Sequence, residues 1–262
     1  MRTAASHSSK HTVTSLGDIA THGDIVAIVG AGGKTTTMFA LANALAERGL
    51  RVVTSKSTVI HAPSMARSPK LVVSKPASWR KELPEALKID PVITVVISNP
   101  TPRRFEGIAP ELAPTLLHDS GADVLIVEAD GARRRLLKIP ATHEPAMPKD
   151  TTVVLPVGCL AAAGAQLTQR LVHRPELAEP LLGLATGITL TATNIITVLL
   201  SEKAGLKSAP TGANVFPVLT ATTSIDTAEL GKLRVILRRD PRITGWVEAD
   251  KHWKFSVHWN TS

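Results

Sequence analysis

Short apolar runs rich in β-branched residues recur along the first two thirds of the chain, and polar or turn-forming residues bound each run. Continuous apolar runs of this length predict strands that are buried on both faces of a sheet. The predicted strands are residues 25–29, 51–54, 92–97, 124–127 and 153–157.

Apolar residues with helical spacing lie between these runs. In residues 36–48 they recur every three or four positions, and Gly49 follows, a residue typical of a helix C-terminus. Further helices are predicted over 188–204 and 226–239, and a further strand over 215–219.

Strands that alternate with helices predict an α/β protein. We expect a mostly parallel sheet with helices on both faces, and a less regular C-terminal portion. Near the C-terminus, Trp253, Phe255, Val257 and Trp259 alternate with polar residues. This period of two predicts a strand with one apolar face, and favours packing over base stacking.

Composition limits the kinds of partner that the protein is expected to bind. The formal charge of +8 suits an anionic partner, but only 3% of the residues are aromatic and tyrosine is absent, which argues against nucleic-acid binding. No apolar run reaches the roughly 18 residues of a membrane span, and the opening residues lack a signal-peptide core, so we predict a cytoplasmic protein with a loose N-terminal tail. Cys159 is the single cysteine, and its apolar neighbours predict a buried position.

The strongest chemical signal is a glycine-rich turn between the first predicted strand and the first predicted helix. Glycines let backbone N–H groups converge on phosphate oxygens, and a helix N-terminus favours an anion. Ile28 stands where the usual pattern has its first glycine, so the loop is shortened. We predict that the loop binds a nucleoside triphosphate through Gly30, Ala31, Gly32, Gly33, Lys34, Thr35 and Thr36.

Two carboxylates follow the strand predicted at residues 124–127. Glu128 and Asp130 alternate along an extended chain, so their side chains lie on the same side. A carboxylate at a strand end holds the metal ion in many phosphate-loop sites, and the loop threonine is a second ligand. We favour Asp130 with Thr35 as the Mg²⁺ ligands and Glu128 for orienting water or substrate. The reverse assignment stays open, as does a plain Asp-Gly turn.

The predicted catalytic residues are thus Lys34, Glu128 and Asp130. A basic run that begins at Arg133 and includes Lys138 comes next, and Arg133 is predicted to contact phosphate or an anionic substrate.

Four segments together resemble the YqeC family, in the same order and over roughly residues 24–219. They are residues 30–36 (GAGGKTT), 127–133 (VEADGAR), 138–145 (KIPATHEP) and 172–176 (VHRPE). The family is described as accessory proteins of selenium-dependent hydroxylases. The resemblance implies a fold like that of phosphate-loop NTPases. It also implies a Mg²⁺-dependent protein that binds or hydrolyses ATP or GTP and serves the maturation of a molybdenum hydroxylase. The hydroxylase or its cofactor would be the partner.

The chain departs from the family at two places. Residues 53–58 keep only some of the hydroxyl groups of a threonine-rich strand end, and residues 220–226 replace an Asn-Lys-x-Asp-like element typical of guanine recognition. The choice between ATP and GTP is therefore left open.

Two histidine–glutamate pairs lie in proline-flanked segments. His143, Glu144 and His173 are predicted to contact substrate or phosphate, and Glu176 completes the second pair. A structural role and metal ligation are the alternatives, although the spacing is not that of a helical zinc motif.

Two other functions fit the same motifs. One is an ATP-dependent ligase or kinase that acts on a small anionic acceptor. The other is a non-enzymatic scaffold for the hydroxylase or its cofactor. We divide the chain into an N-terminal tail and lead-in (1–23), a phosphate-loop nucleotide-binding domain (24–219) and a C-terminal helix and strand extension of that domain (220–262).

Overall fold

A computed structural model of the chain describes residues 15–57, 59–61, 70–101 and 104–260. The predicted loose tail over residues 1–14 lies outside the described residues, as does position 58 of the hydroxyl-rich segment. Among the residues described, no helix is both long and apolar enough to cross a membrane.

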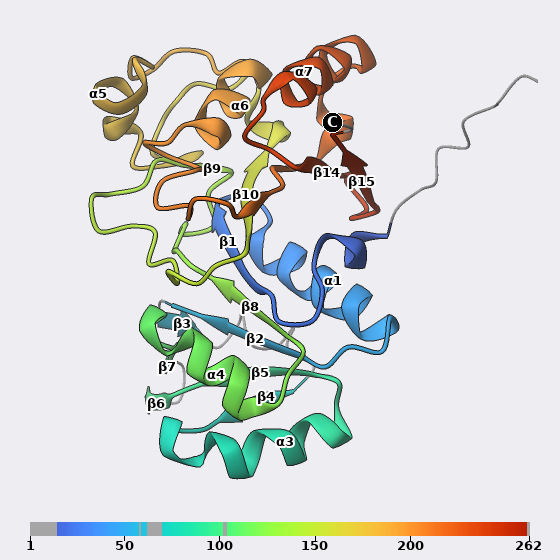
Figure 1. Ribbon diagram of the computed structural model, residues 1–262. Helices are drawn as coiled ribbons and strands as arrows, with labels where there is room; N and C mark the ends of the chain where they lie inside the picture. The colour runs from blue at the N-terminus through green and yellow to red at the C-terminus, as the bar shows by residue number, and fades with distance from the viewer. Residues whose placement is uncertain (1–14, 58, 62–69, 102–103, 261–262) are drawn as a thin grey trace, which may run out of the picture.

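Ten strands form the main sheet within the described residues, in the order β15-β14-β13-β10-β1-β8-β2-β5-β4, with β12 beside β10 (Figure 1). Their bounds are β1 (Ile25–Gly30), β2 (Val52–Lys56), β4 (Leu71–Val73), β5 (Val92–Val96), β8 (Val124–Glu128), β10 (Val153–Cys159), β12 (Asn214–Val215), β13 (Val218–Thr220), β14 (Gly245–Ala249) and β15 (Phe255–Trp259). Neighbouring strands are parallel, except that β15 is antiparallel to β14.

Helices cover both faces of this sheet. They are α1 (Lys34–Glu47), α3 (Trp79–Ile89), α4 (Ala113–Ser120), α5 (Ala178–Leu182), α6 (Ala192–Leu200) and α7 (Thr227–Arg239). Val26 and Ile28 of β1 pack against the α1 side of the sheet. Ala27 and Val29 face the opposite side, in the core that α6 and α7 cover. The predicted α/β class, with a mostly parallel sheet between helices, is confirmed.

Two small sheets lie beside the main one. β9 (Leu137–Lys138) pairs in parallel with β11 (Val172–His173). β7 (Arg104–Glu106) pairs antiparallel with β3 (Val59–His61) and with β6 (Ser98–Thr101). Little regular structure lies between β8 and β10, where the described chain forms only β9, whereas the C-terminal end is built from α7, β14 and β15.

The sequence pattern located α1 well. The helix ends at Glu47, Arg48 is its C-cap residue, and Gly49 follows with a φ of 84°. The N–H of Leu50 returns to the carbonyl of Leu45 at 3.2 Å, which is the hydrogen bond of a left-handed glycine cap.

α6 is shorter than the predicted 188–204. Thr191 caps its N-terminus by accepting a hydrogen bond from the N–H of Asn194 at 3.1 Å. At the other end, Ser201 takes an extended conformation, and Gly205 passes so close to Leu199 that an added Cβ would lie 2.2 Å from its carbonyl oxygen. Local hydrogen bonding and a tight return of the chain therefore set both ends.

The single strand predicted over 215–219 is two short strands, β12 and β13. Both follow one register against β10, with Val154 opposite Val215 and Val157 opposite Val218. Pro156 of β10 has no N–H to donate to this stretch, and Pro217 has none to donate toward β14, so the ladders are interrupted there.

The predicted C-terminal strand begins later than the alternation suggests. β15 starts at Phe255, and Trp253 lies in the turn before it, so its placement in the strand was wrong. Phe255 and Val257 do pack together against the α1 side of the sheet, which confirms the apolar face. Cys159 is buried as predicted.

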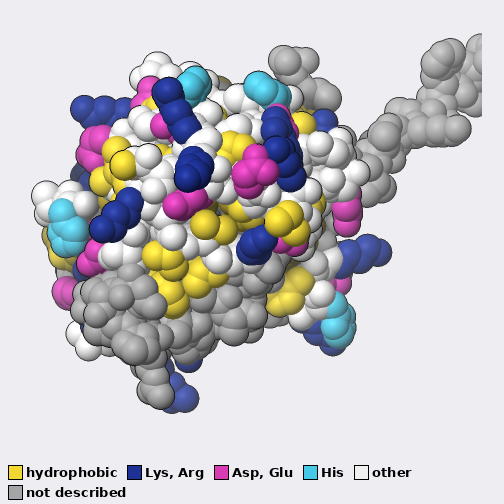
Figure 2. Space-filling model, turned by 90° about the horizontal axis from the view of Figure 1, so that it is seen from below, with side chains coloured by type: hydrophobic (Ala, Val, Ile, Leu, Met, Phe, Trp, Pro, Cys, Tyr) yellow, Lys and Arg dark blue, Asp and Glu magenta, His cyan; other side chains and the backbone are white. Residues whose placement is uncertain are grey.

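Charged side chains of both signs share the face of the molecule on the α3 side. Figure 2 shows Lys or Arg beside Asp or Glu across this face, with apolar side chains between them. The excess positive charge is therefore not gathered into one continuous area in this view.

A partly buried ion pair joins α7 to β14. Both carboxylate oxygens of Glu248 accept hydrogen bonds from Arg234, at 2.8 and 2.7 Å, and the indole N–H of Trp246 donates to Glu248 at 2.9 Å. Burial by itself would raise the pKa of Glu248, but hydrogen bonds from Arg234, His258 and Trp246 outweigh it and lower the pKa to about 2.

Glu248→Gln should therefore destabilise the protein in a pH-dependent way. The folded pKa lies below the ordinary 4.5, so the ionised carboxylate stabilises the fold above pH 4.5, and this contribution is lost as the pH falls toward 2. We expect the variant to unfold on the order of 5 °C lower at pH 7, and the gap to shrink by pH 3. Circular dichroism melting measures both, with the exposed Glu179→Gln as control. An equal gap at pH 7 and pH 3 would contradict the assignment.

Candidate functional site

The glycine-rich loop joins the carboxyl end of β1 to the N-terminus of α1. Gly30, Gly32 and Gly33 have φ values of 90°, 77° and 144°, which favour glycine. A Cβ on Gly30 would lie 2.3 Å from the carbonyl oxygen of Val157, and one on Gly32 would lie 2.6 Å from that of Leu136. Both the conformation and the crowding against neighbouring backbone thus require the glycines.

The loop leaves a series of backbone N–H groups without acceptors. The N–H of Gly30 donates to Asp130 at 3.1 Å, and that of Ala31 donates to Val157 at 2.9 Å. The next N–H with a protein acceptor is that of Thr37, which donates to Gly33 in the first turn of α1. Within the part of the chain that the structure describes, the amides of residues 32–36 therefore remain available to a ligand.

The Lys34 side chain is buried and lies across the glycine-rich loop. Its Nζ donates to the carbonyl of Gly30 at 2.6 Å, lies 3.0 Å from Asp130 Oδ1 and lies 3.7 Å from Glu128 Oε1. Burial by itself would lower the pKa of Lys34, but Asp130 and then Glu128 outweigh it, so the pKa lies above its usual value. The ammonium group is thus charged and held at the loop.

Glu128 lies beside the loop threonine. The Thr35 hydroxyl donates to Glu128 Oε2 at 2.8 Å, and Lys56 Nζ at the end of β2 lies 2.7 Å from the same oxygen. Burial would raise the pKa of Glu128, but Lys56 and Lys34 outweigh it and hold the pKa below the usual range. Glu128 is therefore an ionised carboxylate next to a hydroxyl.

Asp130 occupies a different place from the one expected of a metal ligand beside Thr35. Its Oδ2 accepts the N–H of Gly30, and the same oxygen lies 3.0 Å from Lys138 Nζ. Asp130 is 2% exposed and ties the loop to the segment after β8.

The pairs continue beyond Asp130. Lys138 Nζ also lies 3.1 Å from Glu144, and the Glu144 carboxylate pairs in turn with Arg174. Oppositely charged groups thus alternate, and we call this row the charge chain: Lys56, Glu128, Lys34, Asp130, Lys138, Glu144 and Arg174. Its four cations and three carboxylates leave one net positive charge. Burial would raise the pKa of Glu144, but Lys138 and Arg174 help to hold it below the usual range.

The other residues that were predicted to contact substrate or phosphate lie next to the charge chain. Arg133 and His143 are exposed. His173 is half-buried and lies opposite Lys138 where β11 pairs with β9. Burial first, then Arg174 and Lys138, lower the pKa of His173, so its ring is neutral at pH 7. The described residues hold no group of three or more His, Cys, Asp or Glu side chains arranged to bind a metal ion.

Sequence reasoning did not single out Lys56, and it noted Lys138 and Arg174 only within longer segments. A lysine at the end of a buried strand (VVTSK, residues 52–56) is the signal that would have found Lys56. In the sheet it lies opposite Glu128.

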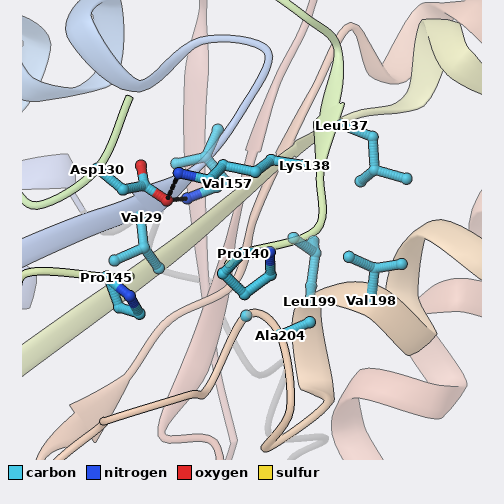
Figure 3. Close-up of a pocket in the computed structure, with 12 residues that line it drawn as sticks. Val29, Asp130, Leu137, Lys138, Pro140, Pro145, Val157, Val198, Leu199 and Ala204 are labelled. Atoms are coloured by element: carbon cyan, nitrogen blue, oxygen red, sulfur yellow. Dashed lines mark hydrogen bonds and ion pairs between the residues drawn. The ribbon is translucent and has the colours of Figure 1, made fainter. Parts of the chain in front are cut away.

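A cavity of about 10 Å³ lies between the carboxyl end of β1 and the end of α6. Figure 3 shows Asp130 and Lys138 facing each other at its edge, with apolar side chains forming the rest of the wall. The space is close to the volume of one water molecule and far below the roughly 300 Å³ of a small-molecule pocket. A ligand of nucleotide size would therefore have to lie on the outer side of the loop.

The topology explains why the loop and the carboxylates meet. The chain runs from β1 through β2 and β5 and returns to β8 beside β1, and then continues to β10 on the other side of β1. Ligands of open parallel sheets bind outside the carboxyl ends of the strands at such a reversal.

The fold and the site together define an α/β protein with a glycine-rich loop at the reversal point of a parallel sheet. Comparison with known proteins then gives its family. The sequence profile described as YqeC protein matches residues 26–176. A protein from Escherichia coli (strain K12), named uncharacterized protein YqeC, is 30% identical over 189 residues, which cover 72% of each chain. The chain belongs to the YqeC family.

Gly32→Ala should destabilise the fold by on the order of 3 kcal/mol, because the new Cβ meets Cys159 and Leu136 and the residue must keep a positive φ. Urea unfolding measures the loss. Gly131→Ala is the matched control, since its Cβ would meet nothing within 4 Å. Equal stability of the two variants would contradict the described loop conformation.

Proposed function

We propose that the protein binds a nucleoside triphosphate with Mg²⁺ on the outer side of the loop formed by residues 30–36. The observation that carries the proposal is the run of unpaired amides over residues 32–36 at the start of α1, beside the charged Lys34. Amides that converge at a helix N-terminus bind phosphate groups, and a lysine at this position contacts the outer phosphates. This arrangement supports the proposal that the protein is a phosphate-loop nucleotide-binding protein.

Lys34 would change partners when the nucleotide binds. It is held by the Gly30 carbonyl and by Asp130, so a phosphate must compete with both. Asp130 would not be left uncompensated, because Lys138 lies 3.0 Å from its other oxygen and the Gly30 amide donates to it. The charge chain can therefore release one cation to a ligand at modest cost.

The metal ion would lie beside Thr35. Mg²⁺ in nucleotide sites usually keeps several waters and takes one or two protein oxygens besides the phosphates. The 2.8 Å contact between the Thr35 hydroxyl and Glu128 favours Glu128 as the acid on the metal side, reversing the assignment that the sequence favoured. Asp130 then acts by holding the loop and Lys34. Hydrolysis of the triphosphate is the reaction that these groups support best.

The biological role that we propose follows from the family resemblance: an accessory protein, cytoplasmic, for the maturation of a molybdenum hydroxylase, with the hydroxylase or its cofactor as partner. The nucleotide would act as the switch that controls binding of this partner. A purely structural nucleotide on a scaffold would instead leave partner binding unchanged in Asp130→Asn.

Transfer to a small anionic acceptor is the second candidate. The exposed Arg133 and the neutral His173 lie near the Lys138 and Arg174 end of the charge chain, where they would hold an acceptor acid. Release of inorganic phosphate without any acceptor favours hydrolysis, whereas a phosphorylated or adenylated acid favours transfer.

Lys34→Met should weaken Mg²⁺–ATP and Mg²⁺–GTP binding about 100-fold, because a charge-assisted contact to phosphate is lost. Isothermal titration calorimetry gives the affinities, and thermal melting verifies that the variant folds. Lys149→Met is the matched control, since Lys149 is exposed. Retained affinity in a folded Lys34→Met variant would overturn the proposal.

Glu128→Gln should raise the Mg²⁺ concentration that supports half-maximal nucleotide binding or hydrolysis about tenfold, as loss of a group beside the metal typically does. Asp130→Asn should instead weaken nucleotide binding without changing that Mg²⁺ dependence. A magnesium titration at fixed nucleotide compares the two variants. The opposite pattern would restore Asp130 as the metal-side acid.

A further inference from the structure

Trp253 lies against the loop in a conformation that bulky residues avoid. It occupies the turn between β14 and β15 with a φ of 62°, and its side chain is 40% exposed. A Cβ on Gly33 would lie 2.9 Å from the Trp253 ring, so the ring contacts the start of α1. A strained, partly exposed aromatic residue at a candidate site points to a role other than packing.

Hydrogen bonds within the turn fix the backbone at Trp253. Asp250 Oδ1 accepts the N–H groups of His252 and Lys254, at 2.7 and 3.0 Å, and the N–H of Trp253 donates to the carbonyl of Asp250 at 3.1 Å. Phe255 flanks the ring, with 6.3 Å between ring centroids. By contrast, Trp246 is fully buried and its indole N–H donates to Glu248. The indole N–H of Trp253 has no such acceptor in the described part of the chain.

The two sides of the loop differ in chemistry. Glu128 and Lys56 lie on the β8 and β2 side, where the metal ion and the outer phosphate would be. β13 and β14 lie on the opposite side, and Thr220 at the end of β13 donates to the carbonyl of Gly32 at 2.6 Å. A triphosphate with its outer end beside Glu128 therefore directs its nucleoside toward the turn that carries Trp253.

We propose that Trp253 is the stacking platform for the nucleobase of the bound nucleoside triphosphate. The inference rests on the proposed nucleotide site and adds the part that recognises the base. Stacking uses the face of the base, which every base presents, so the platform distinguishes a nucleotide from a bare polyphosphate and not ATP from GTP.

Calorimetry with Mg²⁺–ATP, Mg²⁺–GTP and Mg²⁺–tripolyphosphate tests this. Trp253→Leu keeps an apolar side chain but removes the aromatic face, and should weaken binding of both nucleotides about tenfold while leaving tripolyphosphate affinity unchanged. Trp253→Phe should retain most of the nucleotide affinity. Trp259→Leu is the matched control, since Trp259 is 37% exposed at the far end of β15.

The outcomes separate the two proposals. If the unaltered protein binds neither tripolyphosphate nor nucleotide, the loop is not a phosphate site and both proposals fail. If tripolyphosphate binds and Trp253→Leu binds ATP and GTP as tightly as the parent, the platform alone is overturned. Tighter binding of all three compounds by Trp253→Leu would overturn it as well, because the ring would then be a cover over the loop.

Discussion

A buried charge must have a partner of opposite sign, and this constraint organises the whole centre of the molecule. Burying an unpaired ion costs several kcal/mol. Removing one member of a row of alternating buried charges would therefore leave its neighbours unpaired at that cost. Here the row runs from Lys56 through Glu128, Lys34, Asp130 and Lys138 to Glu144 and Arg174. It joins β2, β8, the glycine loop and the segments around β9 and β11. The charges supplied by these elements hold the loop from its β8 side.

The same row makes the loop receptive to an anion. Four cations face three carboxylates, and the amides of residues 32–36 add their dipoles at the start of α1. A polyphosphate is the kind of ligand that meets both demands at once. In the proposed complex, the acidic side of the loop would face the metal ion and the aromatic side would face the base. The chain belongs to the YqeC family, and the proposed biological role follows from that resemblance.

Several elements were predictable because their cause is local. The first strand, the turn of glycines and α1 follow from apolar runs, glycine chemistry and helical spacing within a few residues. Predictions were wrong where turns and prolines, rather than the apolar pattern, set the bounds of an element. α6 ends early because the chain returns at Gly205 against Leu199, and the strand over 215–219 breaks because Pro156 and Pro217 have no N–H for the ladders. Trp253 continued the alternation of the C-terminal strand in sequence, yet the turn held by Asp250 removes it from that strand.

The sequence by itself determined the fold class, the glycine-rich turn between a strand and a helix, and the presence of two acids after the neighbouring strand, since each of these follows from contiguous residues. The tertiary structure decided which acid lies beside Thr35, which lysines complete the charges and where Trp253 lies. These are distances between side chains on separate strands, and they depend on strand order and register. Lys56 and Glu128 are 72 positions apart in the chain and directly opposite in the sheet. Spacing along the sequence carries no trace of that pairing, because it arises only when the parallel strands align.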